Sequence, residues 1–108
     1  MKNDFLMKDV IFHRLADREL AEAIQFYDDR SPGLGSRFRD HVWGAVNFLR
    51  RFPLAAPVLD DGVRKYVVRK FPYNLLYSVE DDYIFILAVA HHKRRPGYWI
   101  DRLHDGTT

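Results

Sequence analysis

The sequence predicts an α+β fold in which a helical hairpin packs on one face of a twisted, mainly antiparallel four-stranded sheet, in the order β-α-α-β-β-β. Two segments in the first half repeat apolar residues at helical spacing, and the second half is rich in β-branched and aromatic residues. The 108 residues are the length of one domain. Residues 1–108 are therefore expected to form a single domain, with flexible ends at 1–7 and 104–108.

The first half predicts one short strand and two amphipathic helices. Val10–Phe12 is a β-prone run, and apolar spacing predicts one helix over Arg14–Asp29 and a second from Leu34 or Ser36 to Arg50. Pro and two Gly in Ser31–Gly35 predict the turn that joins them into an αα-hairpin. The second helix is expected to end at Phe52-Pro53, because a proline disfavours helical geometry at the residue before it.

The second half predicts three further strands after a connecting loop over 54–62. These strands are expected at Val63–Lys70, Tyr73–Glu80 and Tyr83–Ala90, and the last is apolar on both faces, as a central strand is. Two helices cover only one face of such a sheet. The other face needs a cover from Tyr98-Trp99-Ile100, from a partner chain, or from both.

Composition excludes several classes of protein. Zero cysteines exclude disulfides, a thiol nucleophile and cysteine-ligated metals. The longest apolar run has eight residues, Tyr83–Ala90, which is too short to span a membrane. His91 and His92 are neighbours at the end of a strand, where side chains point to opposite faces, so no metal site is expected. The sequence predicts a cytoplasmic protein with no cofactor and no membrane partner.

Basic charge is concentrated in the second half. Residues 1–62 carry nine Lys/Arg and ten Asp/Glu, a net charge of −1, whereas residues 63–108 carry eight and five, a net charge of +3. Much of this excess lies in the run HHKRR, residues 91–95. Two interpretations stay open: a solvated basic loop, or a site that faces phosphates or an acidic partner.

Four segments together resemble a known family. They are ELAEAIQFYDDRSPGLGSRF (19–38), FPLAAPV (52–58), GVRKYVVRKFPYNLLYSVEDD (62–82) and ILAVAHHKRRPGYW (86–99). In order and spacing they resemble the RelE/ParE superfamily of type II toxin–antitoxin modules, often called plasmid-stabilisation proteins. The β-α-α-β-β-β order is the fold that this superfamily adopts.

The resemblance implies a toxin that arrests growth and is neutralised by a cognate antitoxin protein. RelE-like members cut mRNA on the ribosome as metal-independent endoribonucleases, whereas ParE-like members inhibit DNA gyrase without known catalysis. A third alternative is a non-toxic domain that binds a partner. Whether this chain is an enzyme is left open by the sequence.

The RelE-like pattern implies four catalytic candidates. Cleavage through a ribose 2′-OH needs a base, cations for the phosphate and an acid for the leaving oxygen. Val67 and Asn74 depart from the pattern, since each stands where such an enzyme carries a cation. The matching or neighbouring positions are Lys65, His92, Arg94 and Tyr98. The residues expected to contact RNA or a partner are Arg69, His91, Lys93, Arg95 and Trp99.

Overall fold

A computed structural model describes residues 7–104, so the expected flexible ends lie outside the described residues except for Met7 and His104. Both predicted helices are present, and each extends one residue beyond its expected end. In chain order the elements are β1 (Asp9–Phe12), α1 (Arg14–Arg30), α2 (Leu34–Arg51), β2 (Val58–Asp60), β3 (Val63–Val67), β4 (Tyr73–Val79), β5 (Tyr83–His91) and a C-terminal 3₁₀ helix (Ile100–Leu103).

The sheet has five strands, in the order β1-β5-β4-β3-β2, where four were predicted. Strand β1 runs parallel to β5, and the other neighbours are antiparallel. The added strand is β2, which lies within the segment 54–62 that was expected to be a loop. All three of its residues are exposed, and its pairing with β3 is irregular. An exposed edge strand lacks the alternating burial by which strands are recognised in sequence.

The helical hairpin is fixed at both helix starts. His13 caps α1, because its Nδ1 accepts a hydrogen bond from the Leu15 N–H at 3.0 Å. Gly35, in the first turn of α2, donates its N–H to the Asp28 carboxylate of α1 at 2.8 Å. A Cβ at Gly35 would come within 2.8 Å of that carboxylate and closer still to the Ile24 carbonyl oxygen. Only glycine therefore lets the two helices approach this closely.

The main core lies between the helices and the sheet. At its centre, Phe38 is fully buried among Tyr27, Phe71 and Tyr73, with ring centroids 4.9 to 5.2 Å apart. The buried members of this core are Ala16, Leu20, Ala23, Phe38, Val42, Ala45, Val46, Leu49, Ala56, Val68, Leu75, Tyr77, Ile84, Ile86 and Val89.

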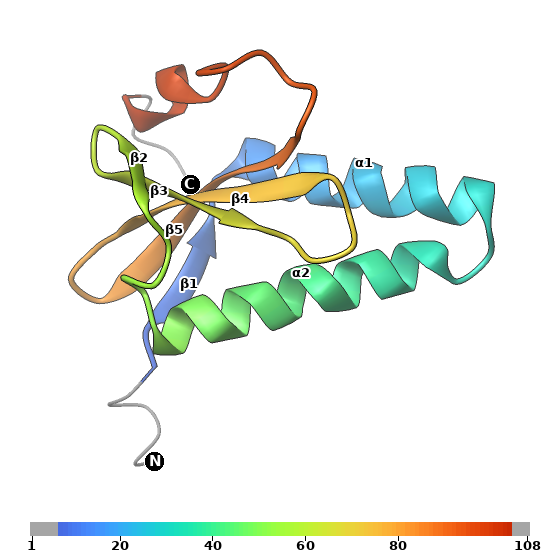
Figure 1. The fold of residues 1–108 in the computed structure, drawn as a ribbon, viewed down its shortest axis with the longest axis horizontal. Coiled ribbons are helices and arrows are strands. Elements are labelled where there is room, and N and C mark those ends of the chain that lie inside the picture. Colours follow the sequence, from blue (N-terminus) through green and yellow to red (C-terminus); the bar gives the residue numbers. More distant parts are fainter. Residues whose placement is uncertain (1–6, 105–108) are drawn as a thin grey trace.

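The chain's own C-terminal segment covers the second face of the sheet. In Figure 1 this red segment crosses the sheet on the side opposite α2. Trp99 is only 3% exposed and packs there in a second core with Val63, Leu76, Leu87, Ala88 and Ala90. From the sequence, this face was expected to be covered by residues 98–100, by a partner chain, or by both, and the structure shows the chain's own residues in that place. Within residues 7–104, no helix is long and apolar enough to cross a bilayer.

Candidate functional site

A pocket of about 210 Å³ lies on the second sheet face, beside the loop that follows β5. Buried Leu76 and Ala90 give it apolar lining, and lysine, histidine and arginine give it a basic rim. Within the described part of the chain no Asp or Glu lines it, so the pocket suits an anionic group. Its lining residues are Leu59, Lys65, Asn74, Leu76, Ala90, His91, His92, Arg94, Arg95, Pro96, Gly97, Tyr98 and Trp99.

Strand register explains how these residues meet. Lys65 of β3 pairs with Leu76 of β4, and Asn74 of β4 pairs with Ala90 of β5. Residues directly opposite one another share a face of a sheet, so Lys65 and Asn74 both lie on the second face. The loop after β5 starts where the His92 N–H donates to the Pro72 carbonyl at 2.8 Å. This bond holds the loop beside the turn between β3 and β4.

The Asn74 side chain has an unmet hydrogen-bonding requirement. Its Oδ1 is buried and has no partner among the described residues. Because a buried unpaired acceptor is costly, a ligand that donates a hydrogen bond would be favoured here. Asn74 thus gives the pocket a polar point of recognition where the RelE-like pattern has a cation.

The pocket brings together all four catalytic candidates, Lys65, His92, Arg94 and Tyr98. Three of the expected binding residues, His91, Arg95 and Trp99, also line it.

Two of the expected binding residues lie elsewhere. Lys93 is exposed outside the pocket, and its backbone N–H donates to His91 Nδ1 at 3.0 Å. Arg69 lines a separate pocket with His41 and Phe48 of α2 and with Tyr66. The strand predicted over Val63–Lys70 stops at Val67. Because Arg69 shares this pocket with residues of α2, it lies on the helix side of the sheet.

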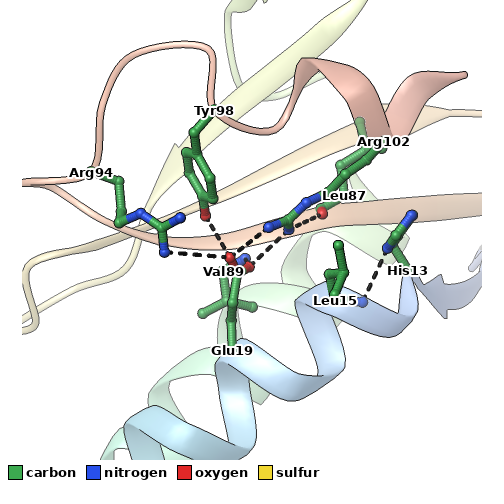
Figure 2. Close-up of polar contacts among 8 residues, drawn as sticks. All are labelled: His13, Leu15, Glu19, Leu87, Val89, Arg94, Tyr98 and Arg102. Carbon is green, nitrogen blue, oxygen red and sulfur yellow. Dashed lines mark hydrogen bonds and ion pairs between the residues drawn. The ribbon is translucent and has the colours of Figure 1, made fainter. Parts of the chain in front are cut away.

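One carboxylate joins the C-terminal segment to α1. Figure 2 shows Glu19 pointing from α1 toward β5, with Arg94 and Tyr98 on one side and Arg102 on the other. The Tyr98 hydroxyl donates to Glu19 Oε2 at 2.8 Å. Arg102 donates to both carboxylate oxygens, at 3.0 and 2.8 Å, while Arg94 Nη1 lies 3.9 Å from Oε2.

These contacts change the acid–base character of the site. Burial and the hydrogen bond to Glu19 raise the pKa of the Tyr98 hydroxyl well above its usual value of 10.0. Burial alone would lower the pKa of Arg102, but the hydrogen bond and charge of Glu19 outweigh it, so that pKa is raised. Tyr98 is therefore a weaker acid than an ordinary tyrosine, and its proton already bonds to Glu19.

The His91 ring is less basic than that of an ordinary histidine. Burial first, and then the charges of His92 and Lys93, lower its pKa from 6.5. The neutral ring also fits its hydrogen bond, in which Nδ1 accepts from the Lys93 N–H. His91 is thus neutral near pH 7.

Sequence reasoning missed Glu19 and Arg102. Glu19 is one of several charged residues on α1, and Arg102 lies outside the basic run at 91–95. No local signal marks them, since 83 residues separate the two partners. Among residues 7–104, no three His, Asp or Glu side chains gather as metal ligands would.

Comparisons with known proteins agree with this fold. A model of the family described as ParE toxin of type II toxin-antitoxin system, parDE, matches residues 10–96. Among solved structures, the chain is similar to one described as the chromosomal ParDE TA system from P. aeruginosa, with 20% identity and a TM-score of 0.69. That match covers 79% of this chain and 96% of the other, and at this identity it shows the fold alone. No curated protein matches the sequence.

Proposed function

Because this chain belongs to the ParE toxin family of type II toxin–antitoxin systems, we propose that it is the toxin of such a pair and acts by binding DNA gyrase rather than by cutting RNA. In this proposal it acts in the cytoplasm, arrests growth by blocking gyrase, and is neutralised by a cognate antitoxin.

The contacts of Tyr98 are the observation that favours binding over RNA cleavage. A nuclease needs a proton donor for the leaving oxygen, yet the Tyr98 hydroxyl donates to Glu19 and its pKa is raised. Arg94 and Arg102 lie against the same carboxylate, which offsets their positive charge. The Tyr98 proton is thus engaged within the protein, and half-exposed Arg94 shares its counter-charge with Arg102.

The two neutral strand positions support the same choice. Val67 is 52% exposed and Asn74 lines the pocket, where the RelE-like pattern has cations. Removing one preorganised group that stabilises charge costs about 3 to 4 kcal/mol of transition-state stabilisation. A surface that binds a protein needs no such charge.

One observation favours a second candidate, ribosome-dependent mRNA cleavage by a metal-independent endoribonuclease. The pocket holds Lys65 and His92 together, and both side chains are exposed. A lysine for the phosphate and a histidine for proton transfer are groups that such a reaction uses.

A supercoiling assay with purified DNA gyrase tests the first candidate. We expect the protein to block supercoiling, and a Lys65→Ala/His92→Ala double variant to block it as well. In parallel, mRNA 5′ ends are mapped after induced expression. New 5′ ends that vanish in the double variant would favour the nuclease.

A third outcome, with gyrase active, transcripts intact and growth normal, would indicate a domain that binds a partner without toxicity. Co-expression with the product of any small reading frame that adjoins the gene tests for the antitoxin. We expect this co-expression to restore growth.

A further inference from the structure

We propose that Glu19 is the positioning residue of this toxin: its carboxylate holds the C-terminal segment 92–103 in place and thereby fixes the wall of the basic pocket. The effect on toxicity rests on the function proposed above, whereas the effect on the segment's position does not.

Both oxygens of the Glu19 carboxylate are fully used. Oε1 accepts from the Val89 N–H and from Arg102 Nη1, each at 3.0 Å, and Oε2 accepts from Tyr98 and from Arg102 Nη2, each at 2.8 Å. The Glu19 side chain is 13% exposed and that of Arg102 is 9% exposed. Charge-assisted, bidentate bonds shielded from water are the strong ones. Glu19 thus joins α1 to β5 and to the C-terminal segment.

The Glu19 and Arg102 side chains also form hydrogen bonds to β5 where β1 has already ended. The last main-chain bond along the β1 side of β5 runs from the His13 N–H to the Ile86 carbonyl, at 2.9 Å. Beyond it, Arg102 donates to the Leu87 carbonyl at 2.9 Å, and the Val89 N–H donates to Glu19. Two side chains therefore satisfy the backbone groups that β1 leaves open, which ties the C-terminal segment to the sheet itself.

The charge balance around Tyr98 depends on Glu19. The Arg94 and Arg102 guanidinium groups lie 3.8 and 5.0 Å from the centroid of the Tyr98 ring. Without the carboxylate, two like charges would remain on one ring, and Arg102 would be a buried cation without its partner. Removing one partner of a buried ion pair is strongly unfavourable, whereas replacing both by groups of similar size is tolerated. We therefore expect loss of Glu19 alone to release the segment.

This release would change the pocket directly. Arg94, Tyr98 and Trp99 line the pocket and belong to the segment that Glu19 holds. The family match ends at residue 96, so Tyr98 and Arg102 lie beyond it. The contacts by which Glu19 holds the segment therefore lie partly outside the matched region.

Glu19→Gln in the full chain tests the proposal, with Glu22→Gln as the matched control. Glu22 is exposed on the same helix and lines a pocket with Arg94, but within residues 7–104 it forms no hydrogen bond or ion pair with the segment. The control therefore removes the same charge without removing an anchoring contact. Both are made in a Trp43→Phe background, which leaves Trp99 as the one tryptophan of the sequence. Trp99 emission, its quenching by acrylamide and growth arrest on induction are measured.

We expect Glu19→Gln to shift Trp99 emission to the red, to raise its quenching several-fold and to abolish growth arrest. Glu22→Gln should match the parent in all three measurements. Unchanged Trp99 emission and quenching in Glu19→Gln would overturn the positioning role. A released Trp99 with full growth arrest would overturn its link to toxicity.

A Glu19→Gln/Arg102→Met double variant separates positioning of the wall from folding, and also serves if Glu19→Gln fails to fold. Because both charges are gone, we expect Trp99 to be buried again while Arg94 and Tyr98 stay unanchored, so growth arrest remains lost. Growth arrest at the parent level in this double variant would make Glu19 merely structural and overturn the proposal. A parent that does not arrest growth would contradict the proposed toxin, while the fluorescence of Trp99 would still decide the positioning.

Discussion

Glu19 and Arg102 form a two-point ion pair, with nitrogen–oxygen distances of 3.0 and 2.8 Å, across 83 residues of chain. A guanidinium matches a carboxylate at two points, which an ammonium group cannot do. The same guanidinium also donates to the Leu87 carbonyl. The pair therefore joins a helix, a strand and the C-terminal segment at one place.

Arg102→Lys should lower the free energy of unfolding by about 2 kcal/mol, because a lysine cannot make all of these charge-assisted bonds. Urea unfolding measures the change. The control is Arg39→Lys, whose pair with Asp40 is 3.7 Å long and well exposed. We expect the control to change stability by less than about 0.5 kcal/mol. Equal effects from the two variants would show that the buried pair has no special contribution.

Two glycines of α2 should respond in opposite ways to alanine. Gly35→Ala should destabilise the protein, because its Cβ would press on the Asp28 carboxylate and the Ile24 carbonyl. Gly44→Ala meets open space in mid-helix and should stabilise it by up to about 1 kcal/mol. Thermal unfolding of both variants makes the comparison. A stabilised Gly35→Ala would contradict the close approach of α1 and α2.

Tyr77→Phe should destabilise the protein by about 1 to 2 kcal/mol. Tyr77 is fully buried, and its hydroxyl donates to the Pro53 carbonyl at 2.7 Å, which ties β4 to the end of α2. The variant keeps the ring and leaves that carbonyl without its donor. Guanidinium unfolding measures the loss, and a midpoint equal to that of the wild type would mean that water replaces the hydroxyl at no cost.

His91 should titrate below its usual pKa of 6.5, with burial as the main cause and His92 and Lys93 as further ones. A lowered pKa means that the unfolded chain binds the proton more readily than the folded chain does. The stability that neutral His91 contributes is then complete above pH 6.5 and is lost as pH falls through the folded pKa. NMR titration of the ring protons measures the midpoint, and His92→Asn should move it back toward 6.5. A midpoint at or above 6.5 would contradict this environment.

The sequence predicted most of the fold because burial repeats along it. Phe38, Val42 and Leu49 recur at helical spacing and are fully buried on α2. Strand β2 escaped prediction because all of its residues are exposed. The basic run 91–95 that borders the pocket was predicted from the charge pattern, and Lys65 and Tyr98 from the family resemblance. Glu19 was not predicted, because a single carboxylate on a polar helix face resembles any solvated charge until distant partners fold onto it.

The contacts that complete the fold join residues that lie far apart in the sequence. This separation sets the order in which parts of the fold can form during synthesis. The two helices are neighbours in sequence and can pair while the nascent chain is still growing, but β1 must wait for its partner residues Tyr83 to Ile86. Glu19 must wait longer, until Arg102 has been translated and has left the ribosome. The surface beside the basic pocket is therefore completed last, and a chain cut short before Arg102 cannot form it.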